Sequence, residues 1–137
     1  GGIKNAGVID IIGNAISKVG GSSGSVFIVY TVIVWMSVIL SAFIDNIPYT
    51  ATMLTVIPVI AVNLGIDPKI MYYGLLCGAT LGGNLTPIGA SANIAGIGIV
   101  RKEGHEVKAT TFMKYGVPFT LAAVITGYLL IWLIWKP

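Results

Sequence analysis

Charged side chains are the first thing that this sequence lacks. Asp, Glu, Lys and Arg make up only 9% of its 137 residues, whereas a soluble domain carries about 25%. Hydrophobic residues reach 55%, and the mean hydropathy is +0.91. These values exclude an ordinary soluble domain. Because the net charge of +3 is small and dispersed, we expect no nucleic-acid partner.

Cysteine and histidine are also scarce. Cys77 is the single cysteine, which rules out a disulfide within the chain. The single histidine, His105, falls in a charged segment. No uncharged stretch holds a pair of carboxylates or a serine with a histidine partner. The groups of a hydrolase or a metal cluster are therefore missing, and we expect neither an enzyme nor a cofactor beyond a coupling ion.

Long stretches without charge recur along the chain. A helix crosses the hydrocarbon core of a bilayer with about 20 mostly apolar residues. A signal peptide is excluded because the apolar material recurs four times, at residues 19–44, 46–66, 70–100 and 115–135. The sequence therefore predicts an all-α integral membrane protein whose main environment is the lipid bilayer. It opens on Gly1 rather than methionine, from which we expect a fragment or a processed piece.

An amphipathic segment comes before the apolar stretches. Within residues 1–20, apolar side chains recur at three- and four-residue spacing, and polar side chains fall on the other face. This pattern is typical of a helix that lies along the membrane interface. Its apolar face comprises Val8, Ile11, Ile12, Ile16 and Val19.

The next two apolar stretches predict a pair of helices within residues 25–63. The chain between them reads Asp45-Asn46-Ile47-Pro48. Pro48 suits the first turn of the second helix, and Asp45 or Asn46 is a natural N-cap for it. Pro58 predicts a kink further along this helix.

Residues 70–101 predict a helix that is broken in the middle. Gly74, Gly78 and Gly82 are four residues apart, which lets a neighbouring helix approach closely. Residues 82–93, "GGNLTPIGASAN", contain glycines and a proline that make a continuous helix unfavourable.

The remainder of the chain predicts a polar loop and a last span. Residues 102–114 form the most polar stretch, and residues 115–135 form a final transmembrane helix. Aromatic residues near the end of this helix are typical of a membrane-interface belt; they are Tyr128, Trp132 and Trp135.

Asp45 is the only charged residue between Lys18 and Asp67. A charge at mid-bilayer costs about 2.5–3.5 kcal/mol on insertion scales, so a lone intramembrane aspartate indicates a functional site. Carbonyls at the preceding helix end, with Asn46 and Thr50, would complete a site for Na⁺, or the carboxylate would carry a proton. The alternative is a helix cap in a wet turn between two complete spans. The spacing alone leaves both interpretations open.

The break also has plainer interpretations. "NLT" at residues 84–86 matches a glycosylation signal, or it marks a simple kink. Glycosylation requires an exposed loop, which a break inside the membrane does not provide. A nucleotide-binding loop is a poor interpretation because "GGNLTPIG" has no lysine at its end.

Two motifs together resemble the ion transporter superfamily, in particular the group of arsenite permeases, sodium/proton antiporters and the P protein. They are "SAFIDNIPYTATMLTVIP" and "GATLGGNLTPIGASANI". The resemblance implies an inverted-repeat transporter half, with a re-entrant helical hairpin over residues 25–63 and a discontinuous helix over residues 70–101. The tip and the break would hold an ion through Asp45, Asn46, Thr50, Thr52, Gly82, Gly83, Asn84, Thr86, Ser91 and Asn93, with Asp45, Asn46 and Asn84 as the Na⁺ ligands.

The resemblance also implies a location and a partner. It places a multi-pass protein in the inner (plasma) membrane, with loop 102–114 in the cytoplasm. A half-transporter would pair with a second copy of itself or with a missing N-terminal half. The dicarboxylate transporters of the superfamily carry Ser-Asn-Thr at the tip, where this chain has Asp45, and a second carboxylate would repel an acidic substrate.

We therefore expect a secondary active ion transporter, working by Na⁺/H⁺ exchange or by ion-coupled movement of a small anion. Arsenite efflux is an alternative within the same class. An ion channel or a membrane scaffold without transport belongs to different classes. Neutralising Asp45 would leave a scaffold unaffected, and single-channel current steps would identify a channel.

Overall fold

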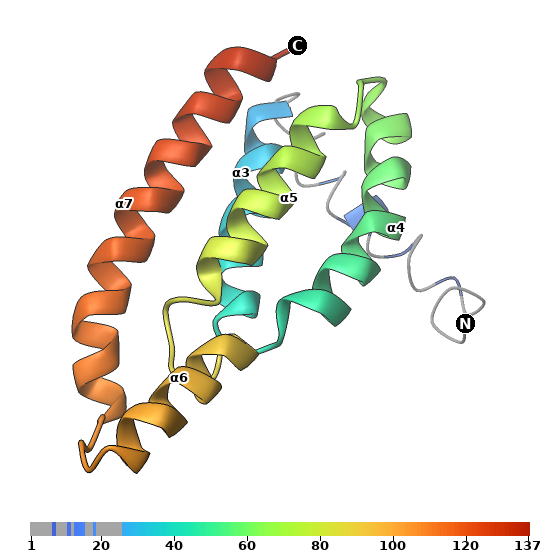
Figure 1. Ribbon diagram of the computed structural model, residues 1–137. Helices are drawn as coiled ribbons and strands as arrows, with labels where there is room; N and C mark the ends of the chain where they lie inside the picture. The colour runs from blue at the N-terminus through green and yellow to red at the C-terminus, as the bar shows by residue number, and fades with distance from the viewer. Residues whose placement is uncertain (1–6, 8–10, 12, 16–17, 19–25) are drawn as a thin grey trace.

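The computed structural model describes residues 7, 11, 13–15, 18 and 26–137, and it contains helices but no strands in this part of the chain. The all-α class is therefore confirmed. Most of the interfacial helix predicted over residues 1–20 lies outside the described residues. Between residues 26 and 137 the helices are α3 (Val26–Ser41), α4 (Asn46–Leu64), α5 (Lys69–Gly82), α6 (Ser91–Lys102) and α7 (Ala109–Trp135) (Figure 1).

Helices α3 and α5 lie side by side in the centre of the molecule (Figure 1). The glycines of α5 face α3, as their spacing predicts. A methyl group on Gly74 would lie 2.7 Å from the Tyr30 ring, and one on Gly82 would lie 2.5 Å from the Val38 carbonyl oxygen. Only glycine therefore permits this close contact, which confirms the predicted small-residue interface.

Helix α7 packs against α5 and reaches the start of α3. The Tyr128 ring stacks on the Tyr30 ring at 5.2 Å between centroids, and the Tyr30 hydroxyl donates to the Tyr128 carbonyl at 2.8 Å. Trp132 packs edge-on against Phe27 at 4.8 Å. Tyr128 and Trp132 therefore join helices within the fold, a role that the sequence did not predict; their place in an aromatic belt stays a prediction.

The last helix begins at Ala109 rather than at residue 115, so only residues 103–108 lie between α6 and α7. Residues 109–114 are polar enough to suggest a loop, yet they include good helix formers such as Ala109, Met113 and Lys114. The first turns of α7 are helical for this reason.

Helix α4 begins at Asn46 and has Pro48 in its first turn, as predicted. Pro58 lies inside it, and Figure 1 shows the helix changing direction along its length. Beyond α4, the Asp67 carboxylate accepts the Lys69 backbone N–H at 2.9 Å. This hydrogen bond, together with the Lys69 side chain, holds the pKa of Asp67 below its usual value.

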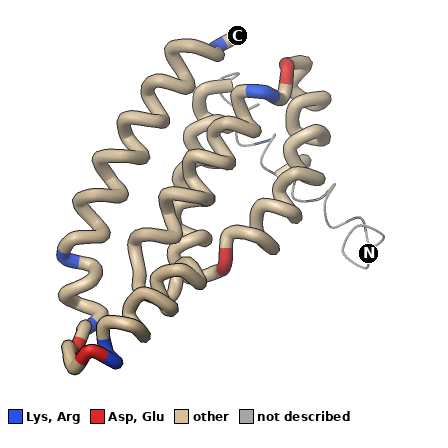
Figure 2. Tube along the Cα trace, viewed as in Figure 1, with Lys and Arg blue, Asp and Glu red and all other residues tan. Residues whose placement is uncertain are grey.

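The long helices have the composition of membrane spans. Within the described residues, α4 and α7 are long enough to cross a bilayer, with mean hydropathies of 1.6 and 2.1. Only 28% and 11% of these stretches are buried inside the chain, so their apolar side chains face outward, as lipid contact requires. Figure 2 shows charged positions at the α4–α5 and α6–α7 turns, with one acidic position at the start of α4 apart from both.

Candidate functional site

Four helix ends meet at one place. Helix α3 ends and α4 begins around residues 42–45, and α5 ends and α6 begins around residues 83–90. The two connecting segments touch, because the buried Thr86 hydroxyl donates to the Ala42 carbonyl. We call residues 41–46 together with residues 83–93 the helix-end cluster. It contains two negative C-terminal ends and two positive N-terminal ends of helices.

Backbone carbonyls converge inside the helix-end cluster at Gly89. A methyl group on Gly89 would lie 2.6 Å from the Gly83 oxygen, 2.9 Å from the Ala42 oxygen and 3.0 Å from the Ser41 oxygen. The absence of a side chain at Gly89 therefore lets three carbonyls from two segments gather around one point. Such a group of oxygens carries partial negative charge.

Asp45 links the two connecting segments. It occupies the N-cap position of α4, yet its side chain makes no capping hydrogen bond there. Its Oδ2 instead accepts a hydrogen bond from the Ser91 hydroxyl, at the first residue of α6, over 2.8 Å. The carboxylate therefore lies at the N-terminal end of a second helix, where its charge is favoured. The Asp45 side chain therefore does not cap α4 through a hydrogen bond, although the residue occupies the predicted N-cap position.

Ser41 and Asn46 form a second link. The Ser41 Oγ donates to the Ala79 carbonyl at 2.5 Å and also contacts Asn46 Oδ1. A hydroxyl has only one proton to donate. Ser41 can therefore bond to both partners if it donates to the Ala79 carbonyl and accepts from the Asn46 amide, with the NH₂ group of Asn46 turned toward it. That orientation leaves the Asn46 oxygen free to face another ligand.

Asn93 holds the break in place. Its Nδ2 donates to the Gly83 carbonyl at 2.9 Å and to the Thr86 carbonyl at 3.0 Å. Both carbonyls belong to the non-helical segment and need partners when water is excluded. Asn93 therefore stabilises the non-helical segment between α5 and α6.

Several predicted site residues have other surroundings. Asn84, although it belongs to the helix-end cluster, lines a cavity against α7. Gly82 faces the α3 backbone. Thr52 is exposed, and its hydroxyl donates to the Pro48 carbonyl at 2.9 Å. Thr50 is half-buried on the first turns of α4.

Comparison with known proteins places the chain in a family. Residues 1–137 match the citrate transporter family. The chain belongs to this family. It is 43% identical over 108 residues to the P protein of Sus scrofa, which covers 73% of the chain. It is also 32% identical over 135 residues, or 97% of the chain, to an uncharacterized transporter of Mycobacterium tuberculosis.

The chain spans only part of these relatives: 12% of the Sus scrofa P protein and 31% of the mycobacterial transporter. A 46 kDa membrane protein of Mycobacterium leprae is 29% identical over 97% of the chain, which again spans 31% of that relative. No solved structure gives a significant match. The chain therefore belongs to a transporter family, and the resemblance to the ion transporter superfamily is confirmed.

Sequence reasoning missed two residues of the helix-end cluster. Ser41, the last residue of α3, is buried against α5, and Gly89 makes room for the carbonyls. A signal for Ser41 was present, since Ser37 and Ser41 are four residues apart in an otherwise apolar helix, as the glycines of α5 are. Nothing in the sequence separated Gly89 from the other glycines of the break.

The helix-end cluster contains neutral oxygens and one carboxylate. Among the described residues, no three His, Cys, Asp or Glu side chains lie together. The oxygens that converge come from backbone carbonyls, hydroxyls and amides, with Asp45 as the charged group. Oxygen donors of this kind suit hard cations rather than soft transition metals.

Proposed function

We propose that this chain is half of a secondary active ion transporter that moves Na⁺ or H⁺ through the helix-end cluster by alternating access. The observation that carries the proposal is the position of Asp45. Its carboxylate lies where four helix ends meet, bound to Ser91 across the two segments. Asp45 is the only charged residue between Lys18 and Asp67, and an isolated ionisable group within a membrane segment is the usual mark of an ion pathway.

Helix lengths support a broken arrangement within the membrane. Helix α5 has 14 residues and α6 has 12, which at 1.5 Å per residue gives about 21 and 18 Å. Both fall short of the hydrocarbon thickness of about 30 Å. We therefore propose that α5 and α6 form one discontinuous helix and that α3 and α4 form a re-entrant hairpin facing its break.

The revised cation site uses Asp45 and Asn46 with the carbonyls of Ser41, Ala42 and Gly83. Two C-terminal helix ends contribute partial negative charge there. We leave Asn84 out of this proposed site because it lines the cavity against α7. Na⁺ and H⁺ are the two coupling ions that this arrangement of oxygens accommodates.

A second candidate is cation-coupled transport of an anion, which the match to citrate transporters favours. The N-terminal ends of α4 and α6 attract anions, while the Asp45 carboxylate repels them. A cation bound at Asp45 would remove this repulsion, which links anion movement to cation binding. Arsenite efflux, by contrast, has no structural observation in its favour, and arsenite is included only as one of the ions in the transport assay.

The number of basic residues does not fix the orientation, because Lys4, Lys18, Lys69 and Lys136 on one side balance Arg101, Lys102, Lys108 and Lys114 on the other. The latter four are clustered around the α6–α7 turn, which favours the cytoplasmic location that the resemblance implies. We propose a multi-pass protein of the inner (plasma) membrane, with the segment within residues 1–20 at the opposite interface.

The experiment is a pH-gradient assay in proteoliposomes with the full-length protein that carries this sequence. Na⁺, K⁺, chloride, citrate and arsenite are added in turn. Collapse of the gradient by Na⁺ alone supports exchange. Collapse by citrate that requires Na⁺ or a proton gradient supports coupled anion transport. A protein that responds to none of the five contradicts the proposal.

A further inference from the structure

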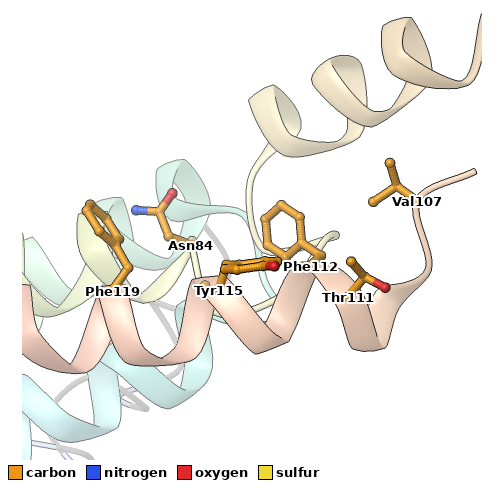
Figure 3. Close-up of a pocket in the computed structure, with 7 residues that line it drawn as sticks. Asn84, Val107, Thr111, Phe112, Tyr115 and Phe119 are labelled. Carbon is orange, nitrogen blue, oxygen red and sulfur yellow. The ribbon is translucent and has the colours of Figure 1, made fainter. Parts of the chain in front are cut away.

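A cavity beside the helix-end cluster lies between the start of α7, the α6–α7 turn and the α5–α6 segment. Its volume is about 610 Å³, within the range of small-molecule sites. Figure 3 shows Phe112, Tyr115 and Phe119 along one side of α7, with Asn84 facing them. The walls are largely apolar, and the few polar groups are neutral. This composition suits a hydrophobic chain that carries neutral acceptors such as ester carbonyls.

The edge of this α7 cavity is basic. Val107 lines the cavity, and the Arg101 Nη2 donates to its carbonyl at 3.4 Å. Lys108 follows Val107 directly and is exposed. The acidic neighbours are Glu103 and Glu106, both exposed, and the only ion pair within the described residues joins Lys69 to Asp67 at the other end of the molecule. Cationic groups therefore border an apolar cavity.

The position of the α7 cavity matches the edge of a bilayer. Val107 of its lining belongs to the turn between α6 and α7, and Figure 2 shows this turn as charged and at one end of the bundle. Tyr115 and Phe119 are 70% and 63% exposed, although they belong to an apolar helix long enough to cross a membrane. A bilayer crossed by α7 would have the charged turn at the headgroup level, with the aromatic walls extending from it toward the hydrocarbon.

We propose that the α7 cavity binds a phospholipid with an anionic headgroup. One acyl chain lies against the aromatic walls, and its glycerol ester faces Asn84 and Thr111. The phosphate lies beside Arg101 and Lys108, where both charge and hydrogen-bond donors match it. This inference is independent of the ion site at Asp45.

The test measures the thermal unfolding midpoint of the full-length protein in detergent. Phosphatidylglycerol, phosphatidylcholine with the same acyl chains, and glycerol 3-phosphate are added separately. We expect phosphatidylglycerol to raise the midpoint by at least ~2 °C more than phosphatidylcholine does. Glycerol 3-phosphate, which has the anion without the chains, should give no rise.

Three variants locate the lipid. Thr111→Trp fills the α7 cavity and should abolish the preference for phosphatidylglycerol, whereas Met113→Trp, a residue of α7 outside the cavity lining, should keep it. Arg101→Gln removes an exposed charge and should reduce the preference without lowering the lipid-free midpoint. Equal effects of the two phospholipids on the wild type would overturn the proposal. A Thr111→Trp protein that keeps the full preference for phosphatidylglycerol would also overturn it. So would a Thr111→Trp protein that is destabilised in the absence of lipid, because that result would mean that another protein segment fills the cavity.

Discussion

Single glycines decide whether the helix-end cluster can form. Gly89 lies against carbonyl oxygens of Ser41, Ala42 and Gly83 at distances that no side chain permits. The sequence predicted that the segment is broken, because glycine and proline recur there. It did not predict which glycine admits the carbonyls, since that depends on a neighbouring segment more than forty residues earlier in the chain.

Gly89→Ala should destabilise the protein by about 1–3 kcal/mol, because the added methyl group overlaps backbone oxygens that cannot move independently. Gly96→Ala is the matched control. Gly96 lies within α6 with no atom near its Cβ position, and alanine favours helix over glycine. Thermal unfolding in detergent compares the two variants. Equal midpoints would show that the carbonyls do not gather at Gly89.

Helix breaks were the most predictable elements of this fold. Pro48 and the glycines of residues 82–89 gave the start of α4 and the end of α5 within a few residues. The start of α7 was less predictable, because polar residues such as Thr110 and Thr111 continue a helix beyond its apolar part. The roles of Tyr128 and Trp132 were missed because aromatic side chains serve equally at a membrane interface and in contacts between helices.

Asn93→Ala should loosen the break between α5 and α6. The substitution leaves the Gly83 and Thr86 carbonyls without their side-chain donor, at a cost of about 1–3 kcal/mol. Hydrogen exchange should accelerate over residues 83–93. Asn63→Ala is the control, since Asn63 donates to Asn14 at 2.8 Å on an exposed surface. Unchanged exchange in the Asn93 variant would contradict the structural task assigned to this side chain.

At the scale of the whole molecule, α6 is left uncovered. None of its residues is buried within the described chain, although Ile94 and Ile99 are large and apolar. The relatives that the chain matches are several times longer. We propose that a second copy or an N-terminal half covers this surface, as expected for one repeat of a transporter.

The chain expressed alone should therefore form oligomers in mild detergent. Light scattering coupled to size-exclusion chromatography measures the mass of the protein component directly. Replacing Ile94 and Ile99 with serine should shift the mass toward that of one chain, whereas Ile47→Ser, at an exposed position of α4, should not. A monodisperse monomer of the unaltered chain would contradict the need for a partner.

Family and class could be predicted from the sequence because they depend on composition and on two local motifs. The ion site could be predicted only in part. Asp45 stood out as an isolated charge, and the structure joins it to Ser91, yet the predicted ligand Asn84 faces another cavity. Helix ends are local features, whereas the side of a helix on which a polar residue lies depends on how the helices pack.

The most direct measurement compares ion-driven proton flux in proteoliposomes for the wild type, Asp45→Asn and Asp67→Asn, all in the full-length protein. Asp67 is an exposed carboxylate at the α4–α5 turn, paired with Lys69 at 3.2 Å, and serves as the matched control. We predict that Asp45→Asn loses coupled flux by at least ~100-fold while its unfolding midpoint stays near that of the wild type, and that Asp67→Asn keeps its flux. Full coupled flux in Asp45→Asn would contradict the assignment of Asp45 as the coupling residue.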